Sequence, residues 1–464
     1  MSDSLRERTI SGMLWSFMQK FGTMAIAFVA NIVLARLLTP DDYGCIGMLL
    51  IFIAVANTFI DGGFGSALIQ KKEPTQEDYS TIFYWNLFLS IVLYGILFFT
   101  APFIADFYEI SLLTPVLRVQ GGVLILNALS IIQCNQLRKQ LRFRSIASVN
   151  LTASLLSVVI TIVLAWIGWG IWALVAQQLL FSLFNAILFW SFNKWVPSFL
   201  FSKKSFKELF GFGGFILLSS LINTFCDNIH GVLIGKFFSP AIMGLYTQAR
   251  KLEEIASTSI SSVVNQVAYP VLSEFQNDNL SMIRVLQRFI TSLAFLVFPL
   301  MMLLILIAKP LIILLYSDKW VASVPYFQIL CIAGMAICLQ MINYNAVAAI
   351  GRSDILLKWT IIKRSLGLIL NIGGLICFGM YGLLWGGVLT AYSLYFINSY
   401  LVSRYVGYRI KSQIKDLFPI IITVLLTFVI TYFLSNLVVL NIYFEGLSVT
   451  IIFMILYLSL SSVF

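Results

Sequence analysis

The sequence predicts an all-α membrane protein that crosses the bilayer many times. Of its 464 residues, 60% are hydrophobic and only 11% are charged, whereas a soluble domain carries roughly 25% charged residues. The mean hydropathy is +0.94, and apolar residues lie in blocks of about 20, the length that crosses a hydrocarbon core of roughly 30 Å. The blocks lack the alternation of a β-barrel strand, and a helix satisfies its own backbone hydrogen bonds in lipid, so we expect helices.

About fourteen spans are predicted, because that number of apolar blocks is bounded by charges, glycine or proline. The first six lie near 12–37, 43–66, 80–105, 113–137, 145–167 and 170–192, and the breaks between them carry residues such as Pro40, Lys71, Asp106, Arg138 and Gly168. The next six lie near 208–236, 244–270, 283–308, 322–349, 355–379 and 381–403, with breaks at residues such as Pro240, Lys309, Gly351 and Gly379. A last pair is expected near 414–436 and 443–464.

The loops predict an orientation, because short loops rich in lysine and arginine stay in the cytoplasm. One side carries twenty cations: Arg6, Arg8, Lys71, Lys72, Arg138, Lys139, Arg142, Arg144, Lys194, Lys203, Lys204, Lys207, Arg284, Arg288, Arg352, Lys358, Arg404, Arg409, Lys411 and Lys415. The opposite side carries only Arg36, Lys236, Lys309 and Lys319. Both termini are therefore expected in the cytoplasm, and the polar start of the chain, without a cleavage pattern, predicts no cleaved signal peptide.

An internal repeat predicts two related lobes. At a shift of 200 residues, the segment 33–40 (VLARLLTP) overlays 233–240 (LIGKFFSP), and Gly44 overlays Gly244. Each repeat would hold six helices, an even number, so both start on the same side and form parallel copies about an axis normal to the membrane. We expect an N-terminal lobe at 1–195, a C-terminal lobe at 196–404 and an extra helix pair at 405–464.

Several function classes are disfavoured by what the sequence lacks. Six cysteines are scattered without a CxxC pair, and His230 is the only histidine, which argues against a disulfide framework or a zinc site. No GxxxxGK[ST] nucleotide motif occurs, and no predicted loop exceeds about 15 residues, which leaves little room for the extramembrane loop of a membrane enzyme. We expect a transporter rather than an enzyme, with no organic cofactor and no nucleic-acid partner.

Five cations lie within predicted spans: Lys20, Arg250, Lys251, Lys363 and Arg364. A charge near the bilayer centre costs at least ~2.5–3.5 kcal/mol, so each is a candidate functional residue. Lys20 lies about 12 Å into its helix, where it either lines an aqueous cavity or extends to the headgroups. Lys363 and Arg364 have no acid within one turn, so they either meet an anionic ligand or anchor on anionic lipid.

Acidic side chains in the spans are candidates for ion coupling. Glu254 can neutralise Arg250 at i, i+4 and Lys251 at i, i+3, which is the structural alternative to a cavity-facing role. Asp227 and His230 share a helix face and could carry a coupling proton, or Asp227 a sodium ion. An interhelical hydrogen bond is the alternative for that pair. Asp61 lies in the segment Asp61-Gly62-Gly63, which is typical of a helix end.

Short motifs at predicted helix ends carry a resemblance to a known family. They are Ser11-Gly12-Met13-Leu14-Trp15, the segment 34–44 (LARLLTPDDYG), the segments 61–65 (DGGFG) and 67–70 (ALIQ), then Gly244-Leu245-Tyr246, 249–252 (ARKL) and 269–273 (YPVLS). In this order, along nearly the whole chain, they resemble the Wzx-type O-antigen and polysaccharide flippases. These belong to the polysaccharide transport branch of the MOP superfamily, which also holds the MATE drug exporters and the lipid II flippase.

The resemblance implies a MATE-like fold in the bacterial cytoplasmic membrane, with inward-open and outward-open states and a central cationic cavity. The implied ligand is an undecaprenyl-diphosphate-linked oligosaccharide for surface polysaccharide, and other polysaccharide-assembly proteins are implied partners. Arg250 matches an arginine that relatives carry. A sodium site of the lipid II flippase would correspond to Asp227, Asn371 and Thr390, while His230 leaves a proton open. A MATE-like multidrug exporter is the alternative function, because fold does not fix substrate.

Overall fold

The computed structural model describes residues 3–276, 278–437 and 442–461, which form sixteen α-helices, one 3-10 helix and no strands. The chain divides into two compact units, Met1–Gly244 and Leu245–Phe464. The all-α class predicted from composition is confirmed. The boundary predicted near residue 195 separates two sequence repeats, whereas these units are separated by compactness. The repeat boundary therefore stays a prediction.

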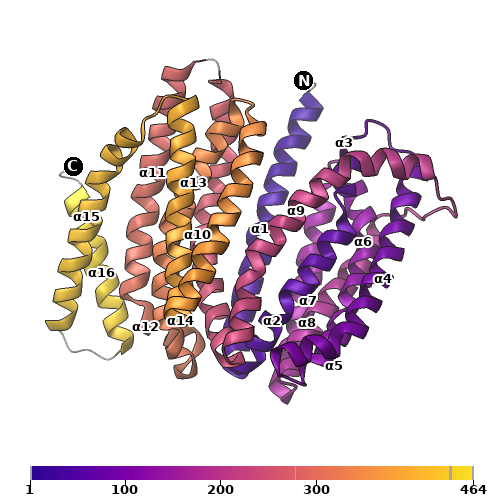
Figure 1. The fold of residues 1–464 in the computed structure, drawn as a ribbon, viewed down its shortest axis with the longest axis horizontal. Coiled ribbons are helices and arrows are strands. Elements are labelled where there is room, and N and C mark those ends of the chain that lie inside the picture. The colour runs from indigo at the N-terminus through magenta and orange to yellow at the C-terminus, as the bar shows by residue number, and fades with distance from the viewer. Residues whose placement is uncertain (1–2, 277, 438–441, 462–464) are drawn as a thin grey trace. The chain divides into compact units, whose positions relative to one another are not determined.

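Unit 1 is a bundle of helices from the first half of the chain (Figure 1). It holds α1 (Asp3–Leu37), α2 (Pro40–Asp61), α3 (Phe64–Gln70), α4 (Gln76–Tyr108), α5 (Leu113–Gln120), α6 (Gly122–Lys139), α7 (Phe143–Ile167), α8 (Ile171–Phe192), α9 (Lys203–Phe237) and the first turn of α10 (Pro240–Glu274). Helix α1 packs along α7, α7 along α8, and α2 along α9.

Unit 2 is a second helical bundle. It holds the rest of α10, then α11 (Asn279–Leu306), α12 (Ala308–Tyr316), the 3-10 helix η1 (Asp318–Ser323), α13 (Val324–Ala349), α14 (Ser353–Tyr405), α15 (Ile410–Leu437) and α16 (Ile442–Ser461). Helix α13 packs against both α11 and α14, and α15 packs against α11 and α16.

Eleven stretches of the described residues are long and apolar enough to span a membrane. Helix α14 counts once among them, although its non-helical backbone at Phe378 and Gly379 divides it into the two spans predicted at 355–379 and 381–403. Helix α10 is not among the eleven and carries four ionisable side chains near its middle, and the described apolar part of α16 is shorter, Gly446–Ser461. Every predicted span thus has a helical counterpart, while the predicted end at 462–464 lies outside the described residues.

The local sequence explains where helices start and stop. Thr39 and Asp42 form a reciprocal cap on α2: Asp42 N donates to Thr39 Oγ1 at 3.3 Å, and Thr39 N donates to Asp42 Oδ2 at 2.9 Å. Asp61 ends the same helix, as predicted, because Gly62 and Gly63 follow with φ values of 54° and 69°, a region that favours glycine.

Glycines let α2 approach α9 and α10 within unit 1. A Cβ atom on Gly44 would lie 1.8 Å from the carbonyl oxygen of Pro240, and a Cβ on Gly244 would lie 1.8 Å from that of Pro40. The starts of α2 and α10 therefore touch backbone to backbone in a reciprocal contact. Residues 200 positions apart exchange the same contact, which is what the predicted twofold relation between the repeats requires.

Candidate functional site

In unit 2, α10 carries the predicted pair of Arg250 and Glu254. Arg250 Nε donates to Glu254 Oε1 at 2.7 Å, and both side chains remain partly exposed, at 35% and 46%. The i, i+4 neutralisation that the sequence allowed is therefore present. The neighbouring Lys251 is exposed. Because Arg250 keeps a third of its surface open while paired, it can still offer guanidinium protons to an anionic ligand.

Glu253, on the same helix, is buried to 4% exposure. Its Oε1 accepts no hydrogen bond from the residues that the structure describes, and it points at α13, where a Cβ on Gly334 would lie 2.4 Å away. Only glycine leaves room there for the carboxyl group. Two thiols of α13, Cys331 and Cys338, also lie near the carboxylate. No ion pair holds this carboxylate among the described residues. A buried carboxylate is costly in a membrane protein, which marks Glu253 as a functional candidate.

Lys363 is the most buried of the five predicted intramembrane cations, at 8% exposure on α14. Its ammonium group donates to Asn398 Oδ1 and lies 5.9 Å from the centre of the Tyr344 ring of α13. No carboxylate pairs with it in the part of the chain that the structure describes. The adjacent Arg364 is half-buried. Neutral partners satisfy some of the ammonium protons but leave the charge uncompensated.

Both buried residues, Glu253 and Lys363, face helix α13. Glu253 faces it at Gly334, and Lys363 faces it at Tyr344. These two α13 residues lie roughly 15 Å apart along the helix, at a rise of about 1.5 Å per residue. Unit 2 therefore holds a buried anion and a buried cation that are too far apart to neutralise each other directly.

Asn371 and Thr390, two members of the predicted sodium site, lie on facing halves of α14. A Cβ on Gly367 would lie 3.0 Å from Thr390 Cγ2, and one on Gly387 would lie 3.7 Å from Asn371 Oδ1. The fold of α14 thus brings both polar side chains to one helix-helix interface. The third member, Asp227, belongs to unit 1, and the three-residue site stays a prediction.

The remaining candidate residues lie in unit 1. Lys20 is exposed on α1, Asp227 is exposed on α9, and His230 is half-buried one turn further along α9. Asp61, at the end of α2, is exposed and lies near Arg138. Among the described residues, no three histidine, cysteine or acidic side chains cluster as metal ligands would.

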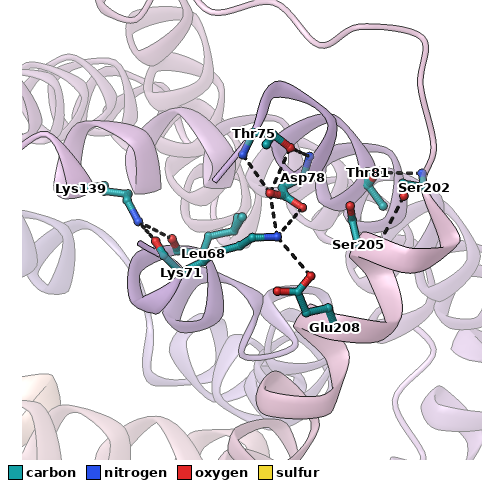
Figure 2. Close-up of polar contacts among 9 residues, drawn as sticks. All are labelled: Leu68, Lys71, Thr75, Asp78, Thr81, Lys139, Ser202, Ser205 and Glu208. Carbon is teal, nitrogen blue, oxygen red and sulfur yellow. Dashed lines mark hydrogen bonds and ion pairs between the residues drawn. The ribbon is translucent and has the colours of Figure 1, made fainter. Parts of the chain in front are cut away.

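A polar cluster in unit 1 joins α3, α4 and α9 (Figure 2). The Lys71 ammonium donates to Asp78 Oδ1 at 3.0 Å and to Glu208 Oε2 at 3.3 Å. Asp78 is almost fully buried at the start of α4 and also caps that helix with Thr75. Lys139, at the end of α6, donates to the carbonyl oxygens of Leu68 and Lys71. We call Lys71, Asp78, Glu208 and Lys139 the α3–α4–α9 cluster.

The α3–α4–α9 cluster and the hydrogen bonds beside it fix the beginning of α9. Ser202 N, at the N-cap of α9, donates to Thr81 Oγ1 at 3.0 Å, and Ser198 N donates to Ser80 Oγ at 3.0 Å. Burial lowers the pKa of Lys71, but its hydrogen bonds and ion pairs with the two carboxylates together raise the pKa by more than burial lowers it, so the net shift is upward. The ammonium form therefore holds the α9 start against α4.

Comparison with known proteins identifies the family. A profile described as "Polysaccharide biosynthesis protein" matches residues 33–325. The chain belongs to the polysaccharide biosynthesis protein family. Teichuronic acid biosynthesis protein TuaB of Bacillus subtilis (strain 168) is 27% identical over 358 residues, covering 77% of this chain and 74% of TuaB. Lipopolysaccharide biosynthesis protein WzxC of Escherichia coli (strain K12) is 24% identical over 374 residues, covering 78% and 74%.

Solved structures confirm the fold of this polysaccharide biosynthesis family member. The lipid II flippase MurJ, in its inward closed conformation, matches with a TM-score of 0.78 at 16% identity, over 97% of this chain and 98% of MurJ. An inward-facing MATE family multidrug transporter of the MOP superfamily matches with a TM-score of 0.62 at 15% identity, over 85% and 98%. The MATE-like fold implied by the sequence motifs is confirmed, and the chain is a multi-pass membrane protein.

Sequence reasoning missed two buried acids of this family member. Glu253 precedes Glu254 on α10, and nothing in its spacing from Arg250 shows that it faces Gly334. Asp78 lies two residues before the span predicted at 80–105 and was not among the candidate residues, although the Thr75-x-x-Asp78 pattern is a helix-cap signal that could have placed it.

Proposed function

We propose that this protein is a flippase that moves undecaprenyl-diphosphate-linked oligosaccharide repeat units across the cytoplasmic membrane for surface polysaccharide synthesis. Family membership and the MurJ-like fold support translocation of a lipid-linked saccharide. The alternation of loop cations supports an orientation with both termini in the cytoplasm.

Buried Lys363 is the observation that carries the proposal. A lysine at 8% exposure without a carboxylate partner among the described residues requires an anion to complete it. A diphosphate supplies two or more negative charges and many acceptor oxygens, while its polyprenyl chain stays in lipid. Arg250, half-exposed beside Glu254, is the second group that we assign to the diphosphate. Lys20, Lys251 and Arg364 remain candidates for the rest of the substrate path.

We further propose that transport is coupled to an ion, either sodium or a proton. The facing placement of Asn371 and Thr390 supports a cation site in unit 2. Asp227 is a candidate for sodium coupling on the sequence and the family resemblance alone. Asp227 with His230 is the candidate pair for a proton instead, and Asp61 is a further candidate for ion coupling.

The test uses a deletion strain of the source bacterium and measures lipid-linked repeat units on the cytoplasmic leaflet together with surface polysaccharide. We expect repeat units to accumulate in the deletion strain and the wild-type gene to reverse this. Lys363→Met should fail to restore polysaccharide at wild-type protein levels, because it removes the buried charge and keeps most of the apolar stem. Lys358→Met is the matched control, since Lys358 is exposed on the same helix and should be dispensable.

Two results would contradict the proposal. If Lys363→Met transports like wild type, the buried cation does not bind the substrate. If the deletion strain makes normal polysaccharide and becomes sensitive to cationic dyes, the protein is a drug exporter like the MATE transporters that share its fold.

A further inference from the structure

The four basic residues between α6 and α7 lie in two different environments. Arg138 lies near Asp61 and Cys134, and Lys139 is held by the carbonyl oxygens of α3 and the residue after it. Arg142 and Arg144 are exposed, and no ion pair holds either of them within the described part of the chain. If these residues served only to keep the loop in the cytoplasm, Arg138 and Lys139 would not need a different environment from Arg142 and Arg144.

A cavity of about 280 Å³ opens beside the second pair, entirely within unit 1. It is lined by Ser11, Gly12 and Trp15 of α1 and by residues 141–144. The Arg144 guanidinium lies over the Trp15 ring, with Cζ 5.4 Å from the ring centre, which fixes the direction of the cation. Among the side chains that the structure describes, no acidic one lines the cavity.

Local backbone geometry builds this cavity. Phe143 packs so closely on α1 that a Cβ on Gly12 would lie 2.6 Å from its ring, so a glycine is needed at that point. Leu141 has a φ of 57°, a left-handed value that is unfavourable for a leucine. Its side chain is 39% exposed at the cavity edge. The result is a basic, aromatic-walled hollow with an apolar rim.

We propose that this cavity binds the phosphate group of an anionic membrane lipid. It lies where the apolar spans of α1 and α7 begin, Ser11–Leu37 and Phe143–Ile167, at the depth where tryptophan and basic side chains meet headgroups. Its volume of about 280 Å³ lies just below that of ligand pockets, which are roughly 300–1,000 Å³. It therefore admits a headgroup but not acyl chains, which would pass over Leu141 into the bilayer. Arginine suits phosphate because its planar fork donates two hydrogen bonds at once.

Two lipids share this chemistry: a glycerophospholipid and an isoprenoid diphosphate. The test measures lipid binding to the purified full-length protein by native mass spectrometry, with phosphatidylglycerol, undecaprenyl diphosphate and zwitterionic phosphatidylcholine as probes. The variants are Arg142→Gln with Arg144→Gln, and Ser11→Trp, which fills the cavity without changing charge. The control is Lys203→Gln with Lys204→Gln, two exposed cations elsewhere in unit 1.

We expect both cavity variants to bind one anionic lipid about tenfold or more weakly than wild type, given the strength of two basic contacts. The control pair and phosphatidylcholine binding should not change. Loss confined to phosphatidylglycerol identifies a phospholipid site, and loss confined to undecaprenyl diphosphate identifies a carrier-lipid site. If neither anionic lipid binds more weakly to the cavity variants, or if the control pair loses as much, the inference is wrong.

Discussion

Gly44→Ala is the substitution that most directly tests the twofold contact between the starts of α2 and α10. The new Cβ would be placed 1.8 Å from the carbonyl oxygen of Pro240, and a backbone atom cannot rotate away as a side chain can. The two helix starts would have to separate by roughly 1.5 Å to restore a normal contact, within a part of unit 1 where both glycines are buried.

The magnitude follows from two opposing terms. Overpacking of a tight interior typically costs about 1–3 kcal/mol, and backbone contacts lie at the upper end. Alanine recovers up to about 1 kcal/mol of helix propensity relative to glycine. We expect a net loss of about 2 kcal/mol, which corresponds to a lower Tm by about 4–8 °C for a unit of this size.

The assay is thermal unfolding of the purified protein in one detergent, followed by circular dichroism or by thiol exposure. Gly95→Ala is the matched control, because Gly95 is also helical in unit 1 and a Cβ there would have no atom within 4 Å. Its Tm should stay unchanged or rise slightly.

Gly244→Ala supplies a second, independent test of the same geometry. Its Cβ would lie 1.8 Å from Pro40 O, so its cost should equal that of Gly44→Ala. One separation of the helix starts relieves both clashes, so the double variant should lose less than the sum of the single losses. A Tm for Gly44→Ala equal to that of Gly95→Ala would refute the reasoning, as would strictly additive losses.

Two further predictions concern charged side chains. Glu253→Gln should lower transport of lipid-linked repeat units at least tenfold while keeping or raising Tm, because it removes a buried charge. The control is Glu274→Gln, since Glu274 is exposed on the same helix. Wild-type transport by the Glu253→Gln variant would contradict a role for Glu253. Lys71→Met should lower the free energy of unfolding by about 1 kcal/mol, and with it the Tm, unlike the exposed Lys72→Met. Because the pKa of Lys71 is raised above its ordinary 10.5, the Tm difference between wild type and Lys71→Met should be largest below about pH 10 and should disappear as the pH rises through the raised pKa. A constant Tm difference up to pH 12 would contradict the ion pairs.

Much of the fold could be predicted because hydropathy alone fixes where a chain can cross a membrane. The spans follow from apolar length and the helix end at Asp61 from Gly62-Gly63. The matched segments around Pro40 and Pro240 point to the pair of helix starts that touch each other, while the full repeat stays a prediction. The bend inside α14 was also visible as a break near Gly379. What the sequence did not show is that Ser198 and Ser202 tie the start of α9 to α4, because such contacts depend on tertiary packing.

The candidate site was harder to predict, because the facing direction of a charge on an apolar helix has no periodic signal. Hydropathy found Lys363 and Arg364 as a pair, but the burial of Lys363 against Asn398 depends on how α14 packs on α13. The same limit applies to Glu253. Its neighbours Arg250 and Glu254 pair with each other, and the Glu253 side chain faces Gly334 of α13.

Charges in the two units differ in how they are compensated, and this difference separates structural from functional residues. In the α3–α4–α9 cluster, Lys71 meets two carboxylates and buried Asp78 has a full set of donors, so folding alone explains these residues. In unit 2, Lys363 and Glu253 are also buried, but no ion pair within 4 Å holds either of them among the described residues. Burying such groups lowers stability, and we propose that a ligand or an ion completes them during transport. The flippase proposal therefore depends on the uncompensated charges that face α13 rather than on the total number of cations.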